Sequence, residues 1–383
     1  MSVPSIYFAG GKILGASGGV YASSGGGGSG NPTPTGYSGS LAASGTFTVT
    51  GSGFGANGPN IVLVEDFESD TPGSKVSLTG PVIGQWSSYN NSNGYTASNV
   101  AAHTGSVSFN AVDANQVTNG TGTQFASNQL TIQFGEQQEA FLSYWVYTPN
   151  QQFNGEYGNE GGPGVLGTIP DPGNFAYDSC WKMCWFQKSL NDISGTDFNM
   201  VIPSYASAGQ FQVAGESQVL ISNFGNTWWS FTTWNRLSTW LRGAPNQGSG
   251  QSAGNLQTLN TQKGMNTFQF GTSPLFQSGN TYFSSLNIVG YTAVASKTQQ
   301  PLYDDIYLAV NPSGQLSGAC ARVEIGDAAT YTACQHMTIL LATSWADGSV
   351  TSTVPRAGLD FSGQAYAYVW NGNGTVNATG LAV

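Results

Sequence analysis

Paired carboxylates are the first candidates for chemistry in this sequence, because a glycoside hydrolase needs two of them facing one bond. Glu136 and Glu139 are three residues apart, so a regular strand would direct them to opposite faces. Glu156 and Glu160 have a spacing that a strand permits, but the glycines around them are typical of a loop. We expect neither pair to be catalytic, and we predict that the chain is not an enzyme.

Serine and histidine give no stronger catalytic signal. Two G-x-S-x-G sequences, at residues 15–19 and 250–254, match a nucleophile elbow, but neither has a strand before it and a helix after it. His103 and His336 are the only histidines, and their spacing from the cysteines lacks the paired ligands of a zinc site. We therefore interpret His336 as a core or edge residue.

One tryptophan-rich segment has the residue types that bind sugars, namely flat aromatic rings beside amides and a guanidinium. The candidate glycan contacts are Asn226, Trp228, Trp229, Trp234, Asn235, Arg236 and Trp240. Trp228 and Trp229 are adjacent, so a strand would turn them to opposite faces and leave at most one of them for a ligand. The alternative for each tryptophan is a place in the core.

These side chains must be positioned by strands, because no convincing amphipathic helix is present. Apolar and β-branched runs separated by Gly and Asn turns indicate many short strands. They are expected at residues 46–50, 61–64, 130–134, 140–147, 181–186, 210–213, 228–233, 282–289, 305–310 and 366–370. In residues 141–147 both alternating faces are apolar, which favours a strand packed on both sides over one with an aromatic face toward a ligand. Such a pattern predicts a sandwich or jelly roll.

Composition excludes several classes of partner. Only 8% of the 383 residues are charged and the net charge is -10, so there is no basic surface for nucleic acid or for anionic membranes. No apolar run is long enough to insert into a membrane. We expect no nucleic-acid partner and no membrane insertion.

The N-terminus and the cysteines bear on where the protein works. Glycines interrupt the first residues, so no signal peptide is expected, and this favours reduced thiols. Cys180 and Cys184 would lie on one strand face about 13 Å apart, too far for a disulfide. Residues 1–35 are rich in Gly and Ser and predict an extended docking arm with a flexible linker.

Three segments carry a resemblance to known folds. Residues 44–55, ending in Gly51-Ser52-Gly53-Phe54-Gly55, resemble the opening of an immunoglobulin-like domain of the IPT type. Residues 64–68 resemble the start of a concanavalin-like or laminin-G-like jelly roll, and residues 303–308 resemble its last strand. Residues 321–326, 344–355 and 365–369 resemble the second half of the IPT-type domain. The resemblance implies an all-β chain with a lectin-like jelly roll at 60–312, inserted into a small immunoglobulin-like sandwich formed by 36–59 and 313–383.

The jelly-roll resemblance also implies a structural calcium site, because such folds often hold the ion between their first and last strands with carboxylate oxygens. The candidate ligands are Glu65, Asp66, Glu68, Asp304 and Asp305. The alternative is that these acids merely flank strand ends on a solvated rim.

The combination of arm, split sandwich and jelly roll is similar to bacteriophage virion proteins. It implies an exposed capsid decoration or head-fibre protein that docks on other virion proteins through its arm and self-associates, by analogy as a trimer. It also implies assembly in the host cytoplasm, exposure on the virion surface and weak binding of a cell-surface glycan. The alternatives are a tail adhesin, a polysaccharide-degrading tail enzyme, or a secreted bacterial lectin, which would need an export route.

Overall fold

The computed structural model describes residues 30–90, 95–111, 126–147, 181–187, 196–202, 211–215, 220–224, 233–242, 253–262, 264–269, 282–292, 302–311 and 317–383. The predicted arm, the strand expected at 228–233 and the segment with Glu156 and Glu160 lie outside this part. Within it the chain is built from strands, with one short 3-10 helix, η4 (Tyr331–Ala333). The all-β prediction is confirmed. No helix there is long and apolar enough to span a membrane.

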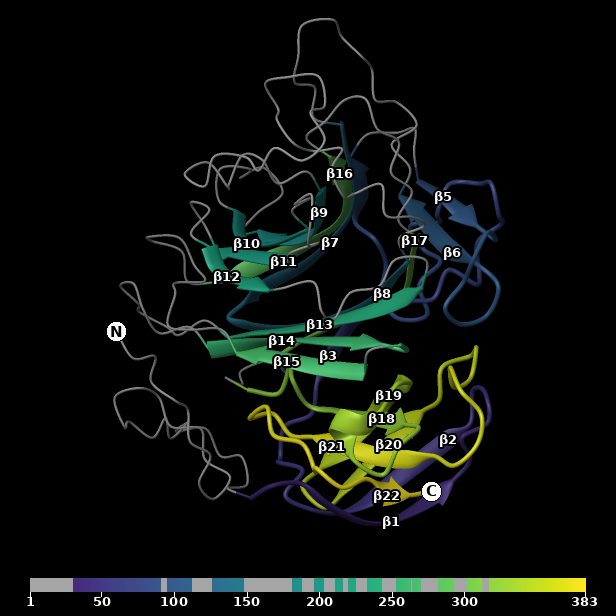
Figure 1. Cartoon of the computed structure of the whole chain (residues 1–383), viewed down its shortest axis with the longest axis vertical. Coiled ribbons are helices and arrows are strands. Elements are labelled where there is room, and N and C mark those ends of the chain that lie inside the picture. The colour runs from purple at the N-terminus through teal and green to yellow at the C-terminus, as the bar shows by residue number, and fades with distance from the viewer. Residues whose placement is uncertain are drawn as a thin grey trace, which may run out of the picture.

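The larger part of the chain is a jelly-roll sandwich of two sheets (Figure 1). One sheet has the order β15-β14-β13-β8-β17-β6-β5, with β3 also paired to β17. Its strands are β3 (Asn60–Glu65), β5 (Tyr95–Ser98), β6 (Ser108–Ala111), β8 (Glu139–Tyr147), β13 (Trp234–Arg242), β14 (Ala253–Asn260), β15 (Gly264–Gln269) and β17 (Leu302–Val310). We call it the inner sheet, because it contributes side chains to apolar cores on both of its faces.

The second sheet lies on the side of the jelly roll away from the small sandwich, and we call it the outer sheet (Figure 1). Its order is β12-β11-β10-β9-β16-β7-β4. Its strands are β4 (Ser88–Asn90), β7 (Ala126–Gln137), β9 (Trp181–Gln187), β10 (Thr196–Ile202), β11 (Phe211–Gly215), β12 (Leu220–Phe224) and β16 (Phe283–Thr292). Leu130, Phe186 and Leu286 from this sheet pack on Leu142 and Tyr144 of the inner sheet and form the jelly-roll core.

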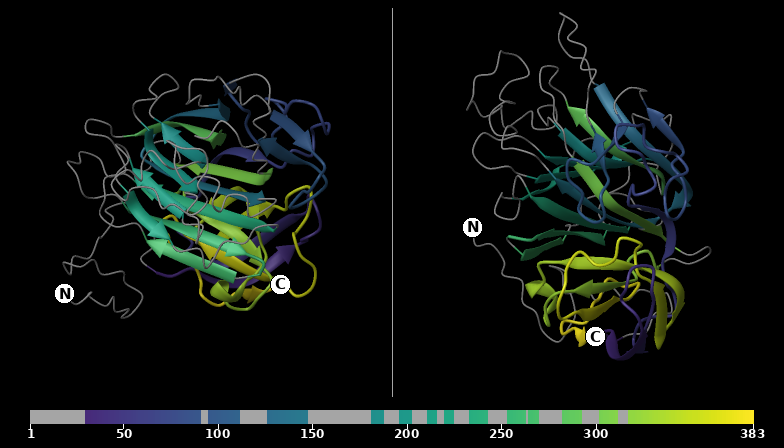
Figure 2. Two further views of the ribbon diagram at one scale, coloured as in Figure 1. Left: turned by 45° about the horizontal axis from the view of Figure 1, so that its top comes forward. Right: turned by 90° about the vertical axis from the view of Figure 1, so that its right-hand side faces the viewer.

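The small sandwich combines two segments that are far apart in sequence. β1 (Thr33–Gly39) and β2 (Thr46–Ser52) join strands from the C-terminal part in the order β1-β2-β20-β19-β18-β21-β22, and Figure 2 shows the two segments together. The remaining strands are β18 (Arg322–Gly326), β19 (Met337–Ala346), β20 (Ser349–Thr353), β21 (Tyr366–Trp370) and β22 (Leu381–Ala382). β19 pairs with β18 through its first half and with β20 through its second, and its pairing with β20 shifts register between Ala342 and Ser344.

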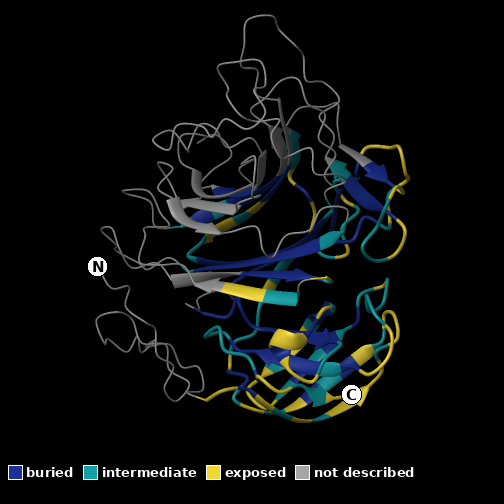
Figure 3. Cartoon of the chain, viewed as in Figure 1, coloured by how far each residue is buried: buried dark blue, intermediate teal, exposed yellow. Residues whose placement is uncertain are grey.

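Each sandwich has an apolar core of its own, and a third apolar core joins the two. We call this contact between the sandwiches the seam. Phe141, Trp145 and Trp240 from the inner sheet pack on Tyr331 and Trp370 of the small sandwich. Strand β8 is therefore buried on both faces, as Figure 3 shows, which confirms the strand packed on both sides that its sequence predicts. The domain boundaries given above stay predictions.

Candidate functional site

Three of the predicted glycan contacts, Asn226, Trp228 and Trp229, lie outside the described residues. Trp240 is 7% exposed in the seam core, and its indole N–H donates to Glu139 at 2.6 Å. Asn235 is buried and accepts a hydrogen bond from Asn260 at 2.6 Å. Neither side chain is offered to a ligand, because Trp240 faces the small sandwich and Asn235, on the opposite face of β13, is buried beside Asn260.

Arg236, another predicted glycan contact, is also inside the seam. It forms a buried ion pair with Glu324 of the small sandwich, and its Nε donates to Ser143 at 3.0 Å. Trp234 is half-buried, with its ring 5.6 Å from that of Tyr147 and 5.8 Å from that of His103. Of the four predicted contacts that the structure describes, Trp234 alone keeps a partly exposed side chain.

The five predicted calcium ligands do not converge. No group of three or more His, Cys, Asp or Glu residues within the described ranges is arranged to hold a metal ion. Glu65 accepts hydrogen bonds from the Phe67 backbone N–H and the Trp86 indole N–H, both at 2.9 Å. Burial raises the pKa of Glu65 to about 7, and both of its oxygens are already engaged by these two donors.

The other acids in that set are engaged by different protein groups. Asp66 forms an ion pair with Arg356, and Glu68 accepts from the backbone N–H groups of Ser106 and Val107 at 2.7 and 2.6 Å. Asp304 is buried and accepts from the backbone N–H of His103 at 2.7 Å. These carboxylates anchor loops and link the two sandwiches, so the donor set does not fit calcium.

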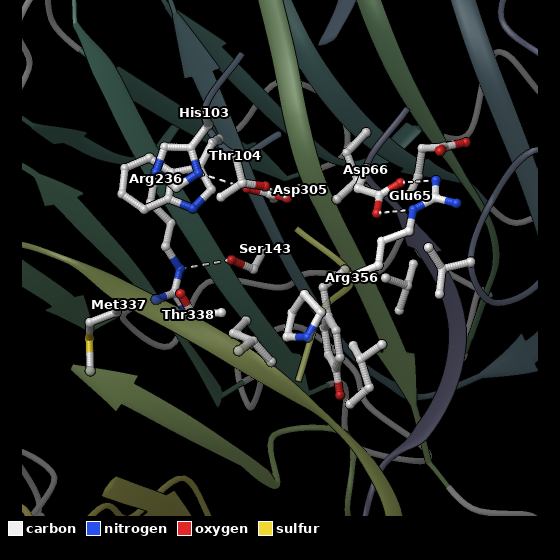
Figure 4. A pocket seen from close by; sticks show the side chains of 18 of the residues that line it. Glu65, Asp66, His103, Thr104, Ser143, Arg236, Asp305, Met337, Thr338 and Arg356 are labelled. Atoms are coloured by element: carbon white, nitrogen blue, oxygen red, sulfur yellow. Dashed lines mark hydrogen bonds and ion pairs between the residues drawn. The ribbon is translucent and has the colours of Figure 1, made fainter. Parts of the chain in front are cut away.

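A small cavity opens in the seam among several of these charged groups (Figure 4). It is lined by residues of both sandwiches, including Asp66, His103, Asp305, Thr338 and Arg356. Its volume is about 50 Å³, which holds a few water molecules at about 10–15 Å³ each and is too small for a sugar ring. We interpret it as a hydrated gap in the seam rather than as a glycan site.

His103 lies at one end of this cavity and is held from three sides. Its ring stacks on Trp145 with centroids 3.6 Å apart, and its Nδ1 lies 2.7 Å from Asp305. Its Nε2 lies 3.5 Å from Oδ2 of Asp360, which belongs to the small sandwich. His336 faces the same oxygen of Asp360 through its Nδ1, at 3.4 Å. Both histidines of the chain therefore meet at one buried carboxylate.

A bulge in β17 brings Asp305 to His103. Pairing between β17 and β8 shifts register between Asp304 and Tyr307, and Asp305 has a φ of 46°. A non-glycine residue in this left-handed region is strained, and bulges of this kind redirect a side chain from its regular position. Here the redirected carboxylate contacts His103 and also accepts from the Thr104 hydroxyl at 2.8 Å.

Sequence reasoning missed this cluster. It treated the histidines as zinc ligands to be rejected or as isolated core residues, and it did not consider Asp360. His103 and Asp360 are 257 positions apart and come together only through the packing of two sandwiches. The chain has only two histidines in 383 residues, which makes each of them a notable residue, but the sequence does not indicate which carboxylate either one contacts.

The outer sheet carries a polar row on the face opposite its core. Register places Ser88 of β4 beside Thr131 of β7, Thr131 beside Asn287 of β16, and Asn287 beside Trp185 of β9. Thr131 donates to the Asn287 amide oxygen at 2.6 Å. Thr131, Asn287 and Trp185 are buried, whereas Gln133, farther along β7 on the same face, is exposed. Hydroxyls, amides and an indole are the groups that neutral sugars bind.

No protein-family model matches the sequence, and no curated protein matches it. Among solved structures, a PL-14 alginate lyase from Aplysia kurodai superposes with a TM-score of 0.41 at 8% identity, covering 65% of this chain and 100% of its own. Lectin II from Ulex europaeus gives 0.37 at 8% identity, with 65% and 99% covered.

The CBM2 module of an evolved Dit protein from Lactobacillus casei BL23 phage J-1 gives a TM-score of 0.30 at 10% identity, with 67% of this chain and 97% of the module covered. At these identities and TM-scores the comparisons add nothing to the fold described above. The chain is a two-sheet jelly-roll sandwich joined to a smaller sandwich through a shared apolar core.

Proposed function

We propose that this chain is a non-enzymatic surface protein of a bacteriophage particle, an exposed capsid decoration or head-fibre protein that stabilises the particle and binds carbohydrate weakly. In this proposal the small sandwich is an IPT-type domain interrupted by the jelly roll, and residues 1–35 dock on other virion proteins. Self-association, as a trimer by analogy, multiplies weak contacts into avidity.

One observation supports this proposal most directly. In the sheet turned away from the small sandwich (Figure 1), the face opposite the core carries the exposed Gln133, and the polar row that leads to it, Thr131, Asn287 and Trp185, is buried. The other sheet is covered by the small sandwich through an apolar core and buried ion pairs. The small sandwich thus forms a base that holds the jelly roll, and the outer sheet of the jelly roll lies on the side away from that base. This arrangement suits display of the outer sheet toward a cell surface.

Location on the particle is tested by mass spectrometry and immunogold imaging of density-purified particles from the source phage. Label over the capsid supports a decoration or head-fibre protein. Label at the tail favours the adhesin or the tail enzyme, and absence from particles overturns the virion proposal.

Carbohydrate binding is tested with the exposed Gln133 at the end of the polar row. Gln133→Ala should weaken binding of host surface polysaccharide about fivefold in titration calorimetry, the size expected for one lost hydrogen bond. Asn266→Ala, which removes an exposed amide from edge strand β15 of the inner sheet, is the matched control and should leave binding unchanged. Equal affinity of wild type and both variants contradicts a glycan contact at Gln133.

The same samples test the enzymatic alternative. Wild-type protein incubated with host capsule should produce no new reducing or unsaturated chain ends. Their time-dependent appearance would overturn the non-enzymatic proposal and favour a polysaccharide-degrading tail enzyme.

A further inference from the structure

We propose that His103 and Asp360, with His336 beside them, form an acid-closed latch across the seam: protonated His103 ties the two sandwiches together, and loss of its proton releases one of the ties. This inference does not depend on the proposed function. It concerns a device within the fold that changes the coupling of the jelly roll to its base.

The latch spans elements of both sandwiches. His103 lies in the segment between β5 and β6, and Asp305 is on β17 of the same jelly roll. Asp360 lies between β20 and β21 of the small sandwich, and His336 immediately precedes β19. The side chains of His103 and Asp360 are 6% and 1% exposed, so water does little to replace a lost partner.

The two nitrogens of His103 face two different carboxylates, and this decides the chemistry. Nδ1 lies 2.7 Å from Asp305 in its own sandwich, while Nε2 lies 3.5 Å from Asp360 in the other. An imidazolium has two N–H donors and serves both carboxylates, whereas a neutral imidazole has one. When His103 is neutral, the shorter contact to Asp305 retains the proton, and Nε2 then presents a lone pair to the buried Asp360 oxygen.

Charged groups from both sandwiches surround the two histidines, and the cavity is also lined by Glu65, whose pKa is raised by burial to about 7. Burial alone would lower the pKa of His103, but Asp305 and Asp360 outweigh it, and the pKa is raised above its usual value. The contact with Asp360 raises the pKa of His336, with a smaller contribution from Asp327 and opposition from burial and from His103. Asp304 accepts from the His103 backbone, and Arg236 and Arg356 on the same cavity are paired with Glu324 and Asp66.

The sign of the effect follows from these directions. A histidine whose pKa is raised on folding contributes stability that is fully present below its unfolded value, near 6.5, and is lost as the pH rises through the higher folded value. Burial would raise the pKa of Asp360, but the two histidines lower it, so Asp360 stays ionised across this window. The seam is therefore tighter in mild acid and looser above neutral pH.

The latch is tested on the full chain by hydrogen–deuterium exchange at pH 6 and pH 9, with rates corrected for the intrinsic effect of pH. Protection of the amides of residues 356–361 and 99–107 should be about tenfold lower at pH 9. A change of this size is expected from the loss of one charge-assisted hydrogen bond. His103→Gln should show low protection at both pH values. Unchanged wild-type protection, or a His103→Gln variant that keeps the wild-type pH dependence, overturns the latch.

A second pair across the seam supplies the matched control. Arg356 and Asp66 also link the two sandwiches, through an ion pair in which no histidine takes part. Arg356→Gln should lower protection by the same factor at both pH values. If Arg356→Gln instead abolishes the pH dependence, the histidines do not control the seam.

NMR titration checks the assignment without relying on stability. With two histidines in the chain, the imidazole region contains two sets of signals, and His103→Gln identifies which belongs to His103. Its midpoint should lie above 6.5 in the wild type and fall in Asp360→Asn. A midpoint at or below 6.5 in the wild type contradicts the latch.

Discussion

Glu139 illustrates how the seam changes the chemistry of a single residue. Its side chain is fully buried at the start of β8 and accepts the indole N–H of Trp240 at 2.6 Å. Burial raises its pKa to about 7, with a partial offset from Arg242 and from the Trp240 hydrogen bond. Folding therefore favours the protonated form of Glu139, and the carboxyl is an internal acid rather than a surface charge.

The pH dependence of stability tests this interpretation. Between pH 4.5 and 7 the folded state binds a proton that the unfolded state releases, so stability falls as the pH rises through this window. Glu139→Gln keeps an acceptor for Trp240 and removes the titration, and it should stabilise the protein at pH 8 by on the order of 2 kcal/mol relative to its effect at pH 4.5. Urea unfolding at the two pH values measures this difference.

Glu65 and the histidines titrate near the same window, so Glu139→Gln should reduce the wild-type slope without abolishing it. Wild-type pH dependence in the variant would mean that Glu139 is not the titrating group. In that case its carboxyl would be ionised or hydrated in solution.

At the scale of elements, the segment between β5 and β6 is the part that carries His103 to the seam. Glu68 holds it by accepting from the Ser106 and Val107 backbone N–H groups and from the Ser106 hydroxyl. Gly105 makes this approach possible: its φ is 65°, and a Cβ at this position would lie 2.4 Å from the Glu68 carboxyl carbon. The position of His103 thus depends on a glycine two residues away.

Gly105→Ala should destabilise the protein by more than the cost of placing alanine in a left-handed backbone conformation, because the added Cβ also displaces Glu68. We expect a loss of about 2 kcal/mol in stability, from the left-handed φ and the displaced Glu68 together, and faster exchange of the Ser106 and Val107 amides. Gly73→Ala is the control, because Gly73 has a φ of 83° with no atom within 4 Å of the added Cβ, so only the backbone cost, about 1 kcal/mol, remains. Equal losses would show that Glu68 moves without penalty.

At the scale of the whole molecule, a buried charge network and an apolar core join the two sandwiches. Arg236 of the jelly roll and Arg322 of the small sandwich both pair with Glu324. Burial alone would raise the pKa of Glu324, but the two arginines outweigh it and lower the pKa to about 2. The Arg322 guanidinium also stacks 4.0 Å from the ring centre of Phe141 and 4.2 Å from that of Trp370.

Arg236→Met should weaken the seam by roughly 2 kcal/mol. A wholly uncompensated buried charge costs about 3–5 kcal/mol, but Arg322, Tyr331 and Trp370 still contact Glu324 after the substitution. We expect one unfolding transition in the wild type and two in the variant, followed by tryptophan fluorescence in urea. Lys75→Met removes a positive charge from an exposed position and should change stability by less than about 0.5 kcal/mol. Two transitions already present in the wild type would contradict a rigid seam.

The fold followed from local patterns more closely than the candidate site did. Alternation in Thr46–Thr50 and the two apolar faces of residues 141–147 identified β2 and the doubly buried β8. The two segments that resemble the first and last jelly-roll strands lie in β3 and β17, which pair with each other. Strands can be predicted from the sequence because apolar residues alternate with polar ones where one face of a strand is buried and the other is exposed. Cys184, Cys320 and Cys334 are buried, and the expectation of reduced thiols stays a prediction.

The site residues were harder to predict because their types do not reveal their partners. Arg236 and Trp240 have the chemistry of glycan contacts, yet the packing of the small sandwich against β13 turns them inward, toward Glu324 and Glu139. The acids proposed for calcium are instead divided among Arg356, Trp86 and backbone N–H groups. The role of such a side chain depends on which residues from distant segments of the chain contact its polar atoms in the folded protein.

The sequence by itself determined that the chain is all-β and weakly charged, since these depend on periodicity and composition, whereas the division into a jelly roll and a smaller sandwich came from the resemblance of its motifs. Only the tertiary structure decided that the two sandwiches share a core and that His103 meets Asp360 there. The physical reason is that burial of a charged group is tolerable only beside a partner, and here those partners lie up to 290 positions away in the chain.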